Sequence, residues 1–298
     1  MRTSAATASA ILLSGMCAGT VVAAKAADEA SGVLRVCADP DNLPLSNDRG
    51  EGYENRIAAR LAQDLRQRVE YTYFPQRMGF VRNTLRMRDP ATSQYKCDVI
   101  VGVPKGYELT ATTQPYMRST YAMIFRERED LASLKTPDDL VKLPRAQRDK
   151  LKIGIFARSP AADWLLRNQM FDQAVSYAQQ SGDIHENPAS IIGRDLQAGK
   201  LDVAIVWGPV AGFLVERHSS GKDTWRSVPF RSYPGIKFDY EISMGVRFGE
   251  KEWKDTLDAW IAGHRSEINT ILASYRIPLL DDKGNPIELA AKTSTETP

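Results

Sequence analysis

The side chains best suited to chemistry in this sequence are aromatic and charged residues that follow the ends of predicted strands. Aromatic rings stack on planar ligands, and arginines pair with carboxylates. Open α/β sheets bind ligands at the carboxyl ends of their strands, so these residues predict a noncovalent binding site. For each of them, ordinary packing at the rim of a cleft or a surface ion pair is the alternative. The candidates are Asp39, Asn42, Tyr53, Glu54, Arg77, Phe80, Tyr116, Arg118, Ser159 and Trp207.

Residue patterns typical of catalysis are missing from the sequence. The three histidines, His185, His218 and His264, are scattered, and no H-E-x-x-H, C-x-x-C or G-x-S-x-G motif occurs. His264 falls on the apolar side of a predicted helix, which favours a structural histidine over a ligand. Asp39 and Asp41 are too few oxygen ligands for a metal, so capping of a loop by an Asx-turn is the favoured interpretation. We therefore predict neither an enzyme nor a metal or cofactor site.

The first 26 residues predict export. A basic residue, Arg2, precedes an apolar run over residues 8–22, and small residues around Ala26 provide an A-x-A cleavage site. Cys17 allows a lipoprotein as the alternative, although Met16 stands where a small residue is preferred. No later run reaches 18 apolar residues, so we expect a soluble periplasmic protein without membrane insertion.

The charge and the length of the mature chain limit its possible partners and its number of domains. Removing residues 1–26 takes away two basic residues and no acid, which leaves 37 basic and 37 acidic residues in a chain of 272. A net charge of zero provides no overall field to attract nucleic acid or anionic lipid. This length suits one large or two medium domains.

Two cysteines, Cys37 and Cys97, remain after the expected cleavage. An even pair in an oxidising compartment is a candidate disulfide, and both residues adjoin strand-like runs. If those strands are neighbours, the bond closes a loop of about 60 residues and contributes roughly 4 kcal/mol in the chain-entropy model. Two free buried thiols are the alternative.

Two blocks of alternating strands and helices organise the chain. The first has strands over 33–38, 69–74 and 97–103, with helices over 53–68 and 79–88 between them. The second has a capped helix at 136, strands over 151–156 and 201–207, and helices from 160 and over 191–198. A strand over 240–247 and one long amphipathic helix over 253–275 follow. This order predicts an α/β protein with mainly parallel sheets and right-handed crossovers.

At this level of detail the sequence resembles the type II periplasmic solute-binding proteins over nearly all of the mature chain. Within that family it is most similar to the MoxJ/XoxJ branch, which is associated with quinoprotein (pyrroloquinoline-quinone, PQQ) alcohol dehydrogenases. The strings that carry the resemblance are CADPDNLPLSN, GYENRIAARLAQDL, PQRMGFVRNTL, VPKGYELTATTQPYMRSTY, LKIGIFARSPAADWLL, LQAGKLDVAIVWGP and YEISMGVR.

The resemblance implies two lobes joined by two crossings, near Tyr121–Phe125 and Tyr240–Gly245. Lobe one would comprise residues 27–122 and a return over 243–282, lobe two residues 123–242, and a polar tail residues 283–298. Amino-acid binders of this fold place an arginine before the PY motif and an aspartate after the last strand of lobe two. Here residues 107–113 contain no arginine and Trp207 stands at the second position, which disfavours uptake of an amino acid.

The resemblance implies an accessory protein for a periplasmic quinoprotein methanol dehydrogenase of the calcium or the lanthanide type. Such a protein would bind the enzyme, or an immature form of it, and assist its maturation or activation. The alternative is a substrate-binding protein of an ABC transporter for a small non-amino-acid ligand. PQQ itself, which is flat and tricarboxylic, is one candidate ligand for this alternative.

Overall fold

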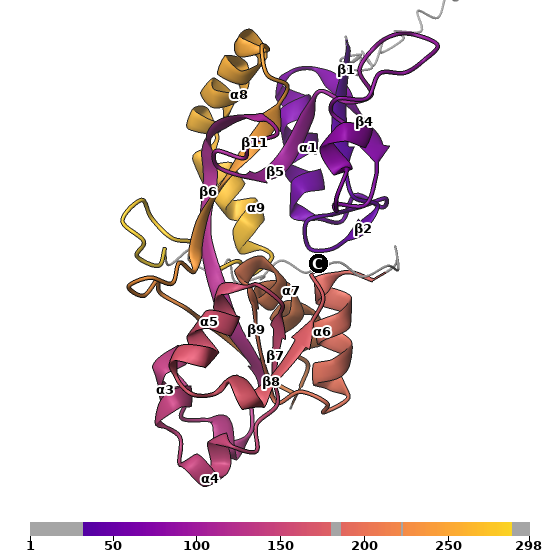
Figure 1. Ribbon diagram of the computed structural model, residues 1–298. Helices are drawn as coiled ribbons and strands as arrows, with labels where there is room; N and C mark the ends of the chain where they lie inside the picture. The colour runs from indigo at the N-terminus through magenta and orange to yellow at the C-terminus, as the bar shows by residue number, and fades with distance from the viewer. Residues whose placement is uncertain (1–31, 180–185, 222, 288–298) are drawn as a thin grey trace, which may run out of the picture.

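The computed structural model of the chain describes residues 32–179, 186–221 and 223–287, which form two lobes (Figure 1). The predicted signal peptide with Cys17, His185, and residues 288–298 of the predicted polar tail lie outside the described residues. The prediction of a two-lobed α/β fold is confirmed.

Lobe one contains a mixed sheet in the order β4-β1-β5-β11-β6. β1 runs parallel to β4 and to β5, whereas β11 runs antiparallel to both β5 and β6. A small hairpin of β2 and β3 follows β1. The strands are β1 (Gly32–Ala38), β2 (Asp41–Asn42), β3 (Ser46–Asn47), β4 (Gln67–Tyr73), β5 (Val99–Pro104), β6 (Ala111–Arg126) and β11 (Asp239–Val246).

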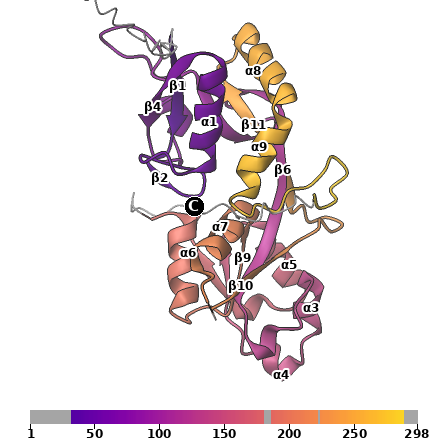
Figure 2. The same cartoon turned by 180° about the vertical axis from the view of Figure 1, so that it is seen from behind.

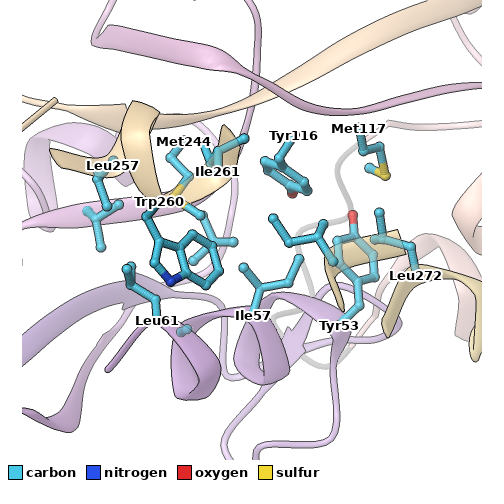
Figure 3. Packing of buried hydrophobic residues seen from close by; sticks show 14 of the residues in the cluster. Tyr53, Ile57, Leu61, Tyr116, Met117, Met244, Leu257, Trp260, Ile261 and Leu272 are labelled. Atoms are coloured by element: carbon cyan, nitrogen blue, oxygen red, sulfur yellow. The ribbon is translucent and has the colours of Figure 1, made fainter. Parts of the chain in front are cut away.

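Helices cover this sheet and bury its core. α1 packs its apolar face, with Ile57 and Leu61, against Leu257 and Trp260 of α8 (Figure 3). Each fully buried side chain of this size contributes about 1.5–3 kcal/mol relative to exposure. The helices of lobe one are α1 (Tyr53–Asp64), α2 (Phe80–Asn83), α8 (Lys251–Gly263) and α9 (Arg265–Ala273).

Lobe two contains a sheet in the order β10-β6-β9-β7-β8, in which β7 runs parallel to β8 and β9. Its strands are β7 (Ile153–Phe156), β8 (Ala174–Tyr177), β9 (Val203–Trp207) and β10 (Trp225–Pro229). Its helices are α3 (Pro137–Lys142), α4 (Arg145–Arg148), α5 (Pro160–Arg167), α6 (Pro188–Gln197) and α7 (Gly208–His218). Short 3₁₀ turns lie at Glu129–Leu131 and Phe171–Gln173.

The strand β6 belongs to both lobes, as Figure 1 shows. Up to Thr120 it pairs with β11 of lobe one, and from Tyr121 onwards it pairs with β9 of lobe two. The chain returns to lobe one between the end of β10 at Pro229 and the start of β11 at Asp239. A single strand of 16 residues therefore forms the first crossing.

The prediction of one helix over residues 253–275 was wrong, because the helix breaks at His264 into α8 and α9. His264 has φ −118° and ψ 17°, which is outside the helical region. Its Nδ1 donates to the Trp260 carbonyl at 2.8 Å, and its Nε2 lies 3.0 Å from Asp64 Oδ2. The ring also stacks on the Trp260 indole, so His264 has the structural role that the sequence predicted.

A disulfide joins Cys37 of β1 to Cys97, which precedes β5, with the two Cα atoms 5.4 Å apart. The prediction of this bond is confirmed. Both cysteines are buried, together with Phe80 and Leu85, in a small cluster at one side of the lobe-one sheet. The bond thus closes a loop with a sequence separation of 60 residues, which contains β2, β3, α1, β4 and α2.

The helix α7 of lobe two packs its glycine face directly on the backbone of lobe one. An ideal Cβ at Gly212 would lie 2.2 Å from the Arg276 carbonyl oxygen, and one at Gly208 would lie 2.2 Å from the Thr120 carbonyl oxygen. Phe213 packs against the cores of both lobes. Arg276 also pairs with Glu216 of α7. The Gly208 contact lies at the β6 crossing, and the contacts of Gly212, Phe213 and Glu216 bind the lobes to each other in addition to it.

Removing the disulfide should destabilise the protein. We expect the Cys37→Ser, Cys97→Ser double variant to lose about 4 kcal/mol of unfolding free energy, because its unfolded chain regains the entropy of the closed loop. Urea unfolding of the oxidised wild type and of the variant measures the difference. Dithiothreitol should lower the stability of the wild type and leave that of the variant unchanged. Equal stability of the two proteins would contradict this.

A methyl group at Gly212 should also destabilise the protein. We expect Gly212→Ala to lose about 1–3 kcal/mol, because the new Cβ meets backbone atoms that cannot rotate away. Gly263→Ala, at the end of α8 with nothing within 4 Å of its Cβ, is the matched control and should gain up to about 1 kcal/mol. Thermal unfolding of both variants checks this. An equal rise in melting temperature for both variants would show that α7 does not pack closely against the backbone of lobe one.

Candidate functional site

A cavity of about 110 Å³ lies between the lobes. Figure 1 shows β2 of lobe one directly opposite the start of α6 of lobe two at this point. Lobe one supplies the loops that follow β1 and β4, and lobe two supplies the ends of β7 and β8 and the start of α6. The described residues that line it are Asp39, Asp41, Asn42, Pro75, Gln76, Arg77, Phe156, Ala178, Gln179, Glu186, Asn187, Pro188 and Ile191.

Asp39 organises the lobe-one wall of the cavity. Its Oδ1 accepts a hydrogen bond from the Asp41 backbone N–H at 2.9 Å, which is the predicted Asx-turn, and its Oδ2 accepts one from the Gln76 backbone N–H. The hydroxyl of Ser46 donates to the Asp39 carbonyl at 2.9 Å. Burial raises the pKa of Asp39, although the backbone hydrogen bonds act against this. Asp39 therefore holds the two loops of this wall together.

Asn187 connects the two walls. As the N-cap of α6 it accepts a hydrogen bond from the Ser190 N–H at 3.0 Å, and its Nδ2 donates to the Asp41 carbonyl of lobe one at 3.2 Å. The prediction of a helix over 191–198 missed this residue. The Asn187–Pro188 pair was the available signal, because an N-cap followed by proline marks a helix start.

The charges around the cavity are mostly negative. Among the described residues that line it are the carboxylates of Asp39, Asp41 and Glu186 and one guanidinium, that of Arg77; Glu186 also pairs with Arg194 at 3.5 Å. A lining of this kind favours neutral or cationic groups over polycarboxylates, because like charges at close range raise the free energy of binding.

The structure brings three of the ten predicted site residues together at the cavity: Asp39, Asn42 and Arg77. Tyr53, Glu54, Phe80 and Tyr116 are buried inside lobe one, each at most 7% exposed. Figure 3 shows the rings of Tyr53 and Tyr116 within the lobe-one core.

The other three predicted residues lie apart from the cavity. Arg118 pairs with Asp239, with Nε 3.0 Å from Oδ1, and donates to the Asp282 carbonyl. Ser159 is the buried N-cap of α5, without a capping hydrogen bond from its side chain. Trp207 packs at the crossing, its ring centre 5.7 Å from that of Tyr121.

Glu54, at the start of α1, is a buried carboxyl group without a hydrogen-bond partner for its Oε1 among the described residues. This oxygen lies so close to Gly102 of β5 that a side chain there would collide with it. Burial, assisted by the charge of nearby Asp39, raises the pKa of Glu54 to about 8. Glu54 is therefore protonated at neutral pH, behind the loop that forms the lobe-one wall.

Within the described ranges, no group of three or more His, Cys, Asp or Glu side chains is arranged to hold a metal ion. In the same ranges, no helix is both long enough and apolar enough to cross a bilayer.

No family model matches the chain. Among solved structures, it is similar to the periplasmic binding protein XoxJ from Methylobacterium extorquens AM1, with 34% identity and a TM-score of 0.65, over 84% of this chain and 100% of XoxJ. The chain belongs to the XoxJ/MoxJ family of periplasmic binding proteins.

Other members of the XoxJ/MoxJ family are consistent with this assignment. Protein MoxJ of Methylorubrum extorquens is 27% identical over 93% of this chain and 94% of its own length. The crystal structure of MxaJ from Methlophaga aminisulfidivorans shares the fold, with 24% identity and a TM-score of 0.67 over 83% of this chain and all of MxaJ.

Stability of this XoxJ/MoxJ-family protein should fall as pH rises from about 4.5 to 8. Glu54 keeps its proton to about pH 8 when folded but only to the ordinary value of 4.5 when unfolded, so the folded state binds more protons in this window. Glu54→Gln should flatten this dependence and raise the melting temperature at pH 8.

Melting temperatures measured from pH 4.5 to 9 check the prediction. Glu252→Gln, which removes an exposed carboxyl group of α8, is the control and should keep the wild-type slope. An unchanged slope in Glu54→Gln would show that Glu54 is already ionised in the folded protein.

Proposed function

We propose that this protein is a periplasmic accessory protein of a PQQ-dependent methanol dehydrogenase, which it binds and helps to mature or activate. The resemblance of long strings such as CADPDNLPLSN to the MoxJ/XoxJ branch suggests this partner. Membership of the XoxJ/MoxJ family supports the same class of partner. In this proposal the protein has no catalytic role, and its site serves binding alone.

The size of the interlobe cavity is the observation that carries the proposal beyond the resemblance. At about 110 Å³ it is far smaller than the 300–1,000 Å³ of usual small-molecule sites. The Asn187–Asp41 hydrogen bond and the glycine face of α7 hold the lobes at this separation. A protein that presents its outer surface to a large partner fits this cavity better than one that encloses a solute in it.

The alternative, a transport receptor for PQQ or a similar planar acid, conflicts with the charge of the cavity. The carboxylates of Asp39 and Asp41 would oppose a tricarboxylic ligand, and Arg77 is the one guanidinium among the described lining residues. The amino-acid anchors are missing too, since the arginine position lies within the arginine-free residues 107–113 and Trp207 occupies the aspartate position. Trp207 instead packs on Tyr121 and Tyr240 at the crossing.

An exposed apolar side chain near the cavity supports docking of a protein there. Met78 is 91% exposed and directly follows Pro75, Gln76 and Arg77, which line the cavity. Large flexible apolar side chains that lie in water before binding are typical anchors at protein interfaces. We therefore place part of the docking surface at the lobe-one rim of the cleft.

Binding to the dehydrogenase tests this proposal. We expect calorimetry to give a dissociation constant of about 1 μM or tighter for at least one of the metal-free, PQQ-free and complete forms of the enzyme. Met78→Ser should weaken binding about tenfold. Leu166→Ser, at an exposed leucine of α5 that is 65% exposed, is the matched control and should have no effect.

Two outcomes would contradict the proposal. One is the absence of binding to every form of the calcium and lanthanide enzymes. The other is a thermal shift with PQQ: a solute at 100 times its dissociation constant stabilises by about 2.7 kcal/mol, and such a shift would support the transport receptor instead.

A further inference from the structure

A second hollow lies next to the cavity, on the other side of the Asn187–Asp41 contact, and we call it the α6–α7 groove. Its volume is about 560 Å³. Figure 2 shows α6 and α7 side by side, with β2 of lobe one above them. The described residues that line the groove are Asp41, Leu43, Arg49, Asn187, Ala189, Ser190, Gly193, Arg194, Gln197, Ala198, Phe213, Leu214, Arg217 and His218.

The groove is basic. Arg49 enters from lobe one, and Arg194 and Arg217 enter from α6 and α7, whereas Asp41 is the one acid among the described lining residues. Arg49 pairs with Glu51, and Arg194 pairs with Asp195, so part of their charge is already balanced.

Arg217 is the exception among these cations. Its guanidinium lies 5.7 Å from the centre of the Phe213 ring, and its charge helps to lower the pKa of Glu51, although within the described part of the chain no carboxylate forms a direct ion pair with it. It is an exposed cation held over an aromatic ring, with hydrogen-bond donors available to a ligand.

The floor of the groove is apolar and closely packed. At Gly193 an ideal Cβ would lie 2.9 Å from Leu214 Cδ2 and 3.2 Å from His218 Nε2, so α6 and α7 approach each other closely there. Gln197 of α6 hydrogen-bonds His218 of α7 at 2.7 Å. Burial and the neighbouring Arg217 lower the pKa of His218, so the arginines alone carry the positive charge of the groove at neutral pH.

An apolar floor with arginines along its walls favours a polypeptide over a small anion. A free phosphate or a lipid headgroup would pair with the arginines but would leave Phe213, Leu214 and Leu43 in contact with water. A peptide segment with acidic and apolar side chains covers both surfaces at once.

We propose that the α6–α7 groove binds an acidic polypeptide segment of a partner protein. The inference rests on the proposed function only for the identity of that partner. Because Arg49 belongs to lobe one and Arg217 to lobe two, a bound segment contacts both lobes and favours the closed arrangement in which they face each other. By linkage, any change that separates the lobes weakens binding of the segment.

Fluorescently labelled hexaglutamate is the probe, and anisotropy measures its binding. We expect the wild type to bind hexaglutamate and not hexalysine, with affinity that falls as salt rises from 20 to 200 mM. The Arg49→Glu, Arg217→Glu double variant should bind about tenfold more weakly or worse. Phe213→Ala would disturb both cores and is therefore not used.

Arg145→Glu with Arg68→Glu is the matched control, because it makes the same change of charge at exposed sites outside the groove. It should retain wild-type affinity, and circular dichroism should show both double variants folded. Arg217→Gln, which removes the charge without reversing it, should give an intermediate affinity. Failure of the wild type to bind hexaglutamate, or equal losses in both double variants, overturns the proposal.

Binding of the dehydrogenase separates this proposal from the proposed function. If the enzyme binds the wild type and the Arg49→Glu, Arg217→Glu variant equally, the groove is not the docking site, although the accessory function stands. If hexaglutamate binds the groove while no form of the enzyme does, the accessory function fails and the groove has another acidic partner. Stronger binding of phosphatidylglycerol vesicles than of hexaglutamate would overturn the proposal in favour of a lipid surface.

Discussion

The uninterrupted backbone of β6 is the constraint on which the arrangement of the two lobes depends. Thr120 is its last residue to pair with β11, and the next residue, Tyr121, already pairs with Trp207 of β9. Because backbone hydrogen bonding changes partner within one peptide unit, little chain is left between the lobes to act as a loose linker. The cleft, the α6–α7 groove and the crossing aromatics all take their positions from this strand.

The sequence correctly predicted those helices and strands that are either buried throughout or buried on one face along their whole length, because their apolar residues follow one regular pattern. The buried strands around Val36 and Ile205 and the amphipathic helix with Ile57 and Leu61 lie where expected, within a few residues. β6 was harder to predict because its first half is rich in threonine and contains Pro115, while its second half is apolar. No single pattern of alternation spans such a strand.

Long-range contacts explain the other differences between prediction and structure. His264 interrupts the predicted helix because its ring binds Asp64, which is 200 residues earlier in the chain. α7 was not predicted because its glycines, Gly208 and Gly212, lower its helix propensity, and only the packing against lobe one explains their presence. Contacts between segments so far apart in the sequence cannot be predicted from the local pattern of apolar and polar residues.

For the candidate site, the rule that ligands meet the ends of strands predicted the region better than the individual residues. Asp39 and Arg77 follow β1 and β4 and line the cavity. Tyr53 and Glu54 stand at the start of a helix near the same edge, but helical geometry turns their side chains towards the sheet. Asn187 supplies the lobe-two wall, and its role could be known only once the lobes were placed together.

The position of Phe213 has a consequence for how the molecule unfolds. Its ring is shared by the hydrophobic cores of both lobes, and the neighbouring Gly212 lies against the backbone of Arg276. Unfolding of either lobe would expose part of the hydrophobic core of the other lobe to water. The two lobes therefore constitute one cooperative unit, and heat should take the protein apart in a single transition with equal calorimetric and van't Hoff enthalpies.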